Sequence, residues 1–316
     1  MWRYIVKRLL WMVLTTLCVA LIIFTIMYFF PGDPAELILG STATAEELEA
    51  YREYLGLNEP YIVQLATYMS DTFLHLDLGT AWVTKVDILE ELGRRVPRTL
   101  ALGWTCIILN SIIGIPLGVT CALKRNSIWD RGVMVFAMLG VSMPDFWVAL
   151  MLVIIFSQKL GWLPSYGIGS LKHWIMPVIA GSIQGIATNA RQTRSAVLET
   201  IRADFVTTAR AKGLTENTVV YKHMLPNAII PVVGQLGAAF GRAIGGTVVI
   251  ETVFSFPGVG SFMTTAVTSH DIPVVRSCVL VLAIFSTVAN LLVDICYAYL
   301  DPRIKAQYVS FGKGKG

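Results

Sequence analysis

Six long apolar runs, separated by polar segments, dominate the pattern along this chain. A bilayer core of about 30 Å needs about 20 apolar residues in a helix, so each run predicts a transmembrane helix. The runs are continuous rather than alternating, which favours helices over a β-barrel. The fourth is the weakest because Gln184 and Asn189 dilute its hydropathy and leave its limits open. The six runs are Leu9–Phe30, Thr99–Leu123, Val133–Ser157, Ile175–Ala190, Ala228–Ile250 and Cys278–Leu300.

The longest polar segment, between the first two runs, predicts short helices of its own. Thr44 and Glu47 have the spacing of a capping box, and the helix that they begin should end near Gly56. Further helices are predicted over Pro60–His75 and Val86–Arg95. This segment carries 12 acidic residues, so we expect a solvated cap outside the membrane.

Glycines recur four residues apart in several runs, at Gly114/Gly118, Gly181/Gly185 and Gly237/Gly241/Gly245. Small residues at this spacing let helix backbones approach closely inside a bilayer. Tight packing within this one chain is the simplest interpretation, and packing against a second membrane-protein chain is the alternative.

Composition supports a membrane protein. Of the 316 residues, 55% are hydrophobic and only 15% are charged, against about 25% charged in an ordinary soluble domain. The first run follows Arg3, Lys7 and Arg8 and could be mistaken for a signal peptide. Its 22 uninterrupted residues exceed an ordinary signal-peptide core and no small-residue cleavage site follows, so we expect a retained helix.

The distribution of positive charge predicts the orientation. With the N-terminus inside, 16 of the 25 Lys and Arg residues fall in cytoplasmic segments, 8 fall outside, and Arg242 lies within a run. Positive charge accumulates on the cytoplasmic side, so both termini are predicted to be cytoplasmic. The chain then divides into a first helix (1–30), an external helical cap (31–97) and a five-helix core (98–316), with a cytoplasmic segment at 191–227 and an external one at 251–277.

Residue chemistry gives no sign of an enzyme. All five cysteines fall inside the apolar runs and the four histidines are scattered, so neither a disulfide framework nor a metal site is expected. The chain has no GxxxxGK[ST] phosphate loop and no Ser/His/Asp constellation. A nucleic-acid partner is not expected.

The polar segment from Arg202 to Pro226 is the most informative part of the chain. It predicts a helix ended by a left-handed cap at Gly213, then a second helix that begins at Glu216 and stops before Pro226. Such an elbow, held parallel to the membrane, would present one face to a soluble protein. The alternative is that its positive charges merely satisfy the orientation rule.

This segment resembles the "EAA" coupling loop of permease subunits in ATP-binding-cassette (ABC) importers. The family pattern is EAA, three residues, Gly, nine residues, Ile, one residue and Leu-Pro. In TARAKG and LPNA the Gly and the Leu-Pro fall in register, and Ala209 alone keeps the EAA triplet, since Thr207, Thr208 and His223 replace Glu, Ala and Ile. The resemblance implies that an ATPase contacts Thr207, Thr208, Ala209, Arg210, Ala211, Lys212, Gly213, Leu214, His223, Leu225 and Pro226.

Further motifs resemble the dipeptide, oligopeptide and nickel branch of these permeases nearly end to end. They are PGDP, LGLNEP, DLG, RVPRTLAL, GWLP, ETVFSFPGVG and DPRI. PGDP and the long first external loop resemble the first (B-type) of the two permeases. The resemblance implies an all-α, six-helix, type I importer permease, multi-pass in the bacterial cytoplasmic (inner) membrane and surrounded by lipid. It also implies a second homologous permease, two ATPases that hold ATP and Mg²⁺, and an extracytoplasmic solute-binding protein, with no cofactor in this chain.

Two sets of residues are candidates for contact with cargo. Asp145 and Arg242 fall within apolar runs and could line the translocation path, where they would meet the ammonium and carboxylate ends of a peptide. The alternative is a buried ion pair that fixes packing. The segment at the external mouth could form a lip that meets the binding protein, or an interfacial element that seals helix ends; its candidate residues are Glu251, Phe254, Phe256, Pro257 and Gly258.

Peptide import is therefore the predicted function, driven by alternating access in which the coupling loop moves with its ATPase. Glutathione or chelated nickel are alternative cargoes in the same architecture. An ion-coupled secondary transporter is the alternative of another class, but it would predict several paired membrane carboxylates and often an internal repeat. A membrane-bound enzyme would need a catalytic constellation, and none is present.

Overall fold

The computed structural model describes residues 2–30, 33–40 and 42–300, and this part of the chain is almost entirely helical. The one β-bridge among these residues joins Thr80 and Asp87. The predicted all-α class is therefore confirmed. The helices in order are α1 (Trp2–Tyr28), α2 (Pro34–Leu39), α3 (Ala45–Tyr54), α4 (Tyr61–Ser70), α5 (Ile88–Leu123), α6 (Ile128–Ser142), α7 (Asp145–Leu152), α8 (Lys172–Thr200), α9 (Asp204–Ala211), α10 (Glu216–Thr218), α11 (Leu225–Val253), α12 (Val259–Thr268) and α13 (Ile272–Leu300).

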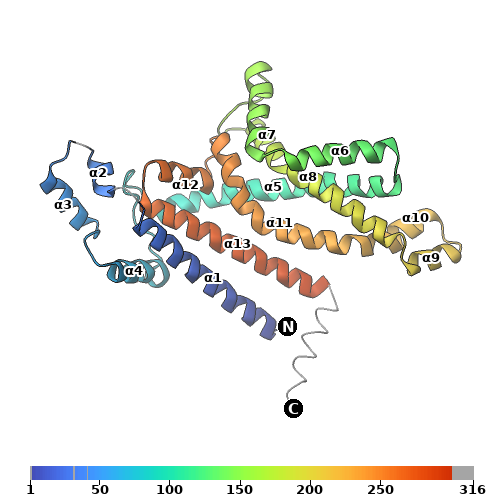
Figure 1. The fold of residues 1–316 in the computed structure, drawn as a ribbon, viewed down its shortest axis with the longest axis horizontal. Helices are drawn as coiled ribbons and strands as arrows, with labels where there is room; N and C mark the ends of the chain where they lie inside the picture. The colour runs from blue at the N-terminus through green and yellow to red at the C-terminus, as the bar shows by residue number, and fades with distance from the viewer. Residues whose placement is uncertain (1, 31–32, 41, 301–316) are drawn as a thin grey trace, which may run out of the picture.

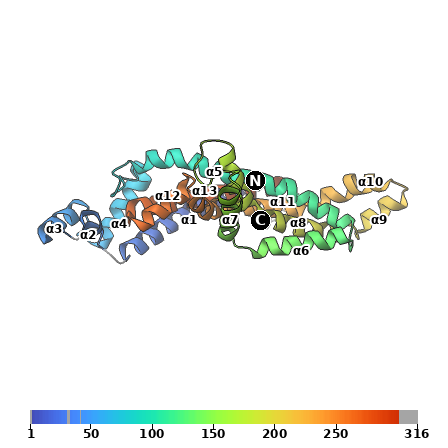
Figure 2. The same ribbon diagram turned by 90° about the horizontal axis from the view of Figure 1, so that it is seen from above.

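The molecule is elongated, and its two large polar segments lie at opposite ends (Figure 1). The long helices α1, α5, α8, α11 and α13 run broadly along the long axis. Helices α2–α4 form the cap at one end, while α9 and α10 project from the other, and the view from above shows the same separation (Figure 2). This is the arrangement expected of segments that face opposite sides of a membrane.

Several helices have the length and composition of membrane spans. Among the described residues, Ile5–Tyr28, Ile88–Leu123 and Ile272–Val293 are both long and apolar enough to cross a bilayer. The bent pair α6 and α7 makes a fourth candidate. Helices α8 and α11 contain 29 residues each, or about 44 Å at 1.5 Å per residue, which is ample length for a core of about 30 Å. The count of six spans and the cytoplasmic location of the termini remain predictions.

The third apolar run is not one continuous helix, and this corrects the expectation from its composition. Helix α6 ends at Ser142 and α7 begins at Asp145, with an angle of 102° between them. Pro144 lies at the break, where its ring disfavours a helical conformation of the preceding residue. Helix α7 then passes into a π-helical segment, η2 (Val153–Lys159). Asp145 therefore lies at the start of a helix instead of the middle of a span.

Local sequence signals locate the cap helices correctly. The capping box of Thr44 and Glu47 begins α3, and the chain turns with a left-handed Gly56 (φ 67°) after the helix ends. The expected second helix comprises α4 and the π-helical turn η1 (Asp71–His75), with Pro60 as the residue just before it. The short helix expected over Val86–Arg95 is instead the beginning of α5, which continues without a break into the apolar run.

Helices α5 and α8 form the most extensive helix pair, and glycines bring their backbones together. A Cβ atom added at Gly118 would lie 2.5 Å from the Ala190 carbonyl oxygen, and one at Gly114 would lie 2.8 Å from that of Ile186. From the other helix, a Cβ at Gly185 would meet the Asn110 side-chain amide at 2.3 Å. These glycines therefore pack within this chain. For Gly237/Gly241, the side-chain environment lies outside the described residues.

The close approach predicts that Gly118→Ala destabilises the protein. The new methyl group would overlap a backbone carbonyl that cannot rotate away, and overpacking of this kind costs about 1–3 kcal/mol. The matched control is Gly132→Ala on α6, where nothing lies within 4 Å and the helix should gain up to about 1 kcal/mol. Thermal unfolding followed by fluorescence-detected size exclusion should show a lower Tm for Gly118→Ala alone; equal Tm values for the two variants would contradict the packing.

Candidate functional site

The polar segment at one end of the molecule folds as an elbow, which we define as residues 204–224. Helix α9 ends in a turn at Gly213, whose φ of 75° is a left-handed conformation that glycine adopts without strain. The predicted left-handed cap is thus present. Helix α10 begins at Glu216, as expected, and passes into a π-helical segment, η3 (Val219–Met224).

The second arm of the elbow does not stop before Pro226, which corrects the sequence prediction. The chain continues from η3 directly into α11, which begins at Leu225. Pro226 lies in the first turn of α11, where its missing N–H removes no helical hydrogen bond. The elbow is consequently joined to a long helix of the bundle with no intervening loop.

Buried apolar side chains fix the elbow to the bundle. Val206 and Ala209 of α9 pack with Val219 and Met224 of the second arm. The same cluster includes residues from three bundle helices: Val119 and Ala122 of α5, Val197 of α8, and Ala228 of α11. Ala209, the one residue that retains the EAA triplet, is only 5% exposed. A small side chain is needed here because the two arms and the bundle meet at this point.

The opposite face of the elbow is open to solvent. Most predicted coupling residues are exposed on it: Thr207, Thr208, Arg210, Ala211, Lys212, Gly213 and Leu214. His223 and Leu225 are partly buried, and Leu225 packs against the apolar cluster. Pro226 is exposed. The His223 carbonyl accepts a hydrogen bond of 2.8 Å from the Asn227 side-chain amide.

Two exposed aromatic residues on the elbow were missed by motif matching. Phe205 and Tyr221 are 44% and 65% exposed, and the motif pattern assigns them no position. Large aromatic side chains that remain exposed in an otherwise polar segment are typical anchors for a protein partner. The sequence does contain a signal for them. Both are large aromatic residues among charged ones, in a segment whose other apolar residues form its buried face.

An ion pair closes the turn of the elbow. The Arg210 guanidinium donates hydrogen bonds of 3.1 and 2.6 Å to the two carboxylate oxygens of Glu216. The pair lowers the pKa of Glu216 and raises that of Arg210, chiefly through these hydrogen bonds. Because the carboxyl pKa is lowered, the pair is intact at neutral pH and is lost as the pH falls through the pKa of Glu216. The two arms are thus tied together across Gly213.

A second ion pair fixes the helices beneath the elbow. Arg194 of α8 donates hydrogen bonds of 2.6 and 2.8 Å to the two oxygens of Asp130, at the start of α6. The Asp130 side chain is only 3% exposed and also accepts the backbone N–H of Asn126 at 2.9 Å. This two-point contact holds α6 against α8, the helix that leads into the elbow.

Asp145 lines a small polar cavity inside the bundle. The cavity has a volume of about 200 Å³ and lies among α5, α7, α8 and α11. Asn110 and Asn189 line it and are joined by a hydrogen bond of 2.8 Å. Further polar side chains come from Gln184, Thr188, Gln235 and Thr247. Arg242 belongs to α11, but its side chain lies outside the described residues.

From the sequence, Gln184 and Asn189 were expected only to lower the hydropathy of the fourth apolar run. Their role in lining the cavity was missed. The usable signal was helical spacing, because Gln184 and Thr188 are four residues apart and therefore share a face of α8 with Gly181 and Gly185.

The residues proposed as an external lip are mostly buried. Phe254 and Phe256 are 2% and 0% exposed and belong to the apolar core. Glu251 is fully buried, and its Oε2 accepts the backbone N–H groups of Gly260 (2.7 Å) and Ser261 (3.1 Å) at the start of α12. This placement favours the alternative of an element that seals helix ends.

Pro257 and Gly258 complete this element through their carbonyl oxygens. The guanidinium of Arg98 donates to the Pro257 oxygen at 3.3 Å, and that of Arg95 donates to the Gly258 oxygen at 3.4 Å. Gly258 also has no room for a side chain, since an added Cβ would lie 2.3 Å from the Glu251 carboxylate. The turn before α12 is therefore fixed to the first part of α5.

A family model described as "Binding-protein-dependent transport system inner membrane component" matches residues 114–306, and the N-terminal model of the same family matches residues 1–103. Together they cover the elbow, the cap and most of the residues that line the cavity. The chain belongs to this family.

Curated relatives match the permease along nearly its whole length. It is 39% identical to the dipeptide transport system permease protein of Alkalihalophilus pseudofirmus, over 96% of this chain and 100% of that protein. It is also 39% identical to the glutathione transport system permease protein of Salmonella typhimurium, over 96% of this chain and 99% of that one.

Solved structures show the same fold. A chain of the MetNI methionine ABC transporter in an inward-facing conformation aligns with a TM-score of 0.59 at 20% identity, over 68% of this chain and 98% of that chain. A chain of an amino acid ABC transporter aligns with a TM-score of 0.54 at 18% identity, over 68% and 99% of the two chains. The permease thus has the fold of ABC importer membrane subunits, and it is a non-enzymatic subunit whose family relies on separate ATPases.

The buried position of Ala209 predicts that Ala209→Leu destabilises the elbow. The larger side chain would separate the two arms, and overpacking of a buried site costs about 1–3 kcal/mol. Ala211→Leu is the matched control because Ala211 is exposed on the same helix. Limited proteolysis at the elbow should accelerate in Ala209→Leu alone. Equal cleavage rates in the two variants would contradict the packed elbow.

Proposed function

We propose that this permease translocates short peptides, delivered by an extracytoplasmic solute-binding protein, across the bacterial cytoplasmic (inner) membrane. The proposal is supported by its 39% identity to permeases named for dipeptide and for glutathione transport. Glutathione is the closest alternative cargo, and chelated nickel remains a further one within the same architecture.

The working complex contains a second homologous permease and two ABC ATPases, and ATP and Mg²⁺ bind to the ATPases. The exposed face of the elbow provides the surface for an ATPase, with Phe205 and Tyr221 as anchors beside the predicted coupling residues. Exposed apolar side chains, such as Leu10 on α1 and Phe136 on α6 at 66% and 76%, provide surfaces for lipid and for the second permease.

The observation that carries the mechanism is the core shared by the elbow and the bundle. Buried side chains of α9 and η3 contact residues of α5, α8 and α11. A close-packed cluster transmits displacement because it has little room to deform. When ATP draws the two ATPases together, each elbow moves with its ATPase, and the helices joined to it change which side of the membrane the path opens toward. Such a shift requires that ATP bind the two states with different affinity.

The polar cavity is our candidate for part of the path. Asp145 and the amides of Asn110 and Asn189 provide groups that can interact with a peptide backbone or its ammonium end. Arg242 is the candidate contact for the carboxylate end. The buried element of Glu251, Phe254, Phe256, Pro257 and Gly258 supports the rim of the outer end, with no direct contact to cargo required.

The coupling role predicts that Gly213→Val uncouples transport from ATP hydrolysis. A β-branched residue is strained at φ 75°, so the turn should rearrange. Gly161→Val is the matched control, since Gly161 has a φ of 63° and open space around it but lies outside the elbow. In proteoliposomes of the whole complex, Gly213→Val should lose peptide-stimulated ATPase activity while the control retains it.

Normal membrane insertion and subunit assembly of both variants must be shown first by blotting and copurification. If the Gly213→Val complex still hydrolysed ATP in response to peptide-loaded binding protein, the elbow would not be the coupling element. Loss of activity in both variants would point to general damage by the strained residue.

The path role predicts that Asp145→Asn and Arg242→Gln alter uptake kinetics. Each removes one charge that a peptide terminus would meet, so the KM for a labelled dipeptide should rise, and the preference between dipeptide and glutathione should change. Glu53→Gln, an exposed carboxylate on α3, is the control. Unchanged kinetics and unchanged preference in both path variants would show that these residues serve packing alone.

A further inference from the structure

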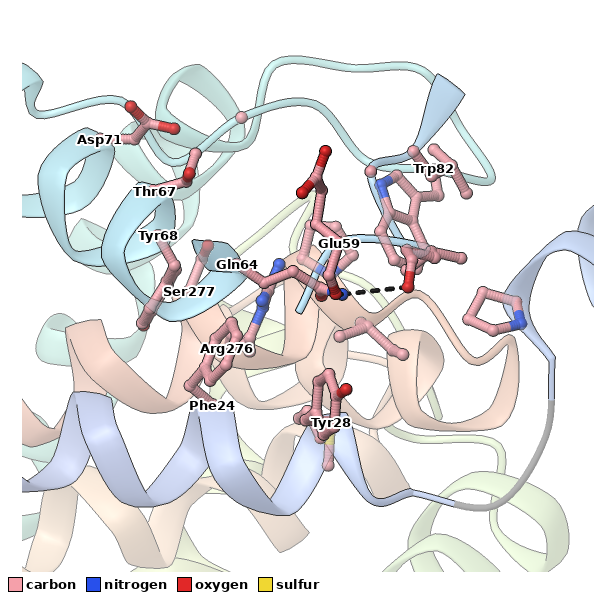
Figure 3. Close-up of a pocket in the computed structure, with 18 of the residues that line it drawn as sticks. Phe24, Tyr28, Glu59, Gln64, Thr67, Tyr68, Asp71, Trp82, Arg276 and Ser277 are labelled. Atoms are coloured by element: carbon pink, nitrogen blue, oxygen red, sulfur yellow. Dashed lines mark hydrogen bonds between the residues drawn. The ribbon is translucent and has the colours of Figure 1, made fainter. Parts of the chain in front are cut away.

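A large pocket lies between the cap and the adjoining ends of α1 and α13 (Figure 3). It shares no lining residue with the polar cavity of the bundle. Its volume is about 880 Å³, within the range of sites that hold small molecules. Side chains of α1, α4, the segment before α5, and α13 line it. Nothing in the coupling mechanism uses this pocket.

Arg276 of α13 contributes an unusual cation to the pocket floor. Its guanidinium lies over the rings of Tyr68 and Phe24, at 4.9 and 5.4 Å from their centroids. Among the described residues, no carboxylate lies within 4.0 Å of it, and its buried Nε has no hydrogen-bond partner. Aromatic faces attract a cation but accept hydrogen bonds poorly, so the guanidinium retains unused donors.

The hydroxyl of Tyr68 is a second unused donor at the same place. It is buried and forms no hydrogen bond of good geometry within the part of the chain that the structure describes, although the Thr72 side chain lies close enough to oppose part of the rise in its pKa. Burial raises the pKa of Tyr68, so the hydroxyl stays protonated and able to donate at neutral pH. A buried polar group without a partner is unfavourable, and two of them side by side suggest that an acceptor belongs there. An anionic group that accepts from both would remove this penalty.

The charges of the remaining lining residues narrow the choice of ligand. The other lining guanidinium, Arg52, is already paired with Asp33, to which its Nε donates at 2.9 Å. The remaining charged residues that line the pocket are the positive Arg276 and three negative residues, Glu59, Asp71 and Asp77. A multiply charged anion would be repelled by this excess of negative charge. A molecule with one anionic group and one ammonium group matches both parts of the pocket.

We propose that this pocket binds a small zwitterion, with its anionic group on Arg276 and Tyr68 and its ammonium group toward the acidic residues. Two sources of such a molecule are available at this end of the permease: a short peptide, through its carboxylate and amino termini, and a phosphatidylethanolamine headgroup. The chemistry that recognises them is the same. Binding here is separate from coupling and needs no ATP.

The test measures binding to the whole complex without binding protein or ATP. In the first arm, the complex is held in nanodiscs of phosphatidylglycerol, which has no ammonium group, and titrated calorimetrically with Ala-Ala, its C-terminal amide and its N-acetyl form. In the second arm, nanodiscs also contain phosphatidylethanolamine, and native mass spectrometry counts the lipids retained. The variants are Arg276→Gln, Arg276→Lys and Tyr68→Phe. The control is Arg94→Gln, an exposed cation on the first part of α5.

If the peptide is the ligand, Ala-Ala should bind, and its affinity should fall about tenfold or more on amidation or in Arg276→Gln, since a charge-assisted hydrogen bond is lost. N-acetylation and Tyr68→Phe should each weaken binding by a smaller factor. If the headgroup is the ligand, phosphatidylethanolamine should be retained over phosphatidylglycerol, and retention should be lost in Arg276→Gln but kept in Arg94→Gln.

The proposal is overturned if neither zwitterion binds the wild-type complex, or if binding is equal in Arg276→Gln and Arg94→Gln. Arg276 would then serve only as a packing cation between two rings. If the Arg276→Gln complex does not assemble, the proposal is tested on folded protein by the affinity of Tyr68→Phe for Ala-Ala and by the affinity of the wild-type complex for the amidated and N-acetylated peptides. Because this binding measurement requires no ATP, its result can still be interpreted if the proposed coupling mechanism is wrong.

Discussion

The close approach of α5 and α8 is the contact on which the rest of the structure depends. Gly114 and Gly118 of one helix and Gly181 and Gly185 of the other remove the side chains that would hold the backbones apart. In a bilayer, where lipid tails are as apolar as the side chains, such packing replaces the hydrophobic effect as the source of helix association. The pair then extends in both directions. At one end, residues of α5 and α8 pack in the apolar core of the elbow. In the middle, the two helices are joined by the buried hydrogen bond between Asn110 and Asn189. At the other end, α5 accepts a hydrogen bond from the first residue of α12.

In the mechanism that we propose, this arrangement lets one subunit respond to a partner at one face and to cargo elsewhere. The elbow has one face packed against the bundle and one exposed face, so force on the exposed face would reach the helices through packed side chains rather than through a flexible linker. The Arg210–Glu216 pair and the continuous passage from η3 into α11 remove the two places where the elbow could bend independently. At the far end, the cap adds a pocket with its own charge pattern, which the transport mechanism does not require.

Local signals in the sequence predicted local structure well. Five of the six apolar runs fall almost wholly within single helices, and the capping box of Thr44 and Glu47 and the left-handed Gly213 are both present. Each of these features depends on a few neighbouring residues. Features decided by tertiary packing were not predicted. Proline can end a helix or begin one, so sequence alone could not place the start of α11 at Pro226. The burial of Phe254, Phe256 and Arg276 depends on segments distant in the chain, and no periodicity reports such contacts.

The central claim is that the exposed face of the elbow touches an ATPase on the cytoplasmic side. A photo-crosslinking amino acid at Thr207, an exposed position on α9, tests it most directly in intact cells. We predict an adduct with the ATPase subunit whose yield changes with the nucleotide state, and none with the external binding protein. An adduct with the binding protein, or efficient labelling of a cysteine at Thr207 by a membrane-impermeant reagent added from outside, would contradict the account.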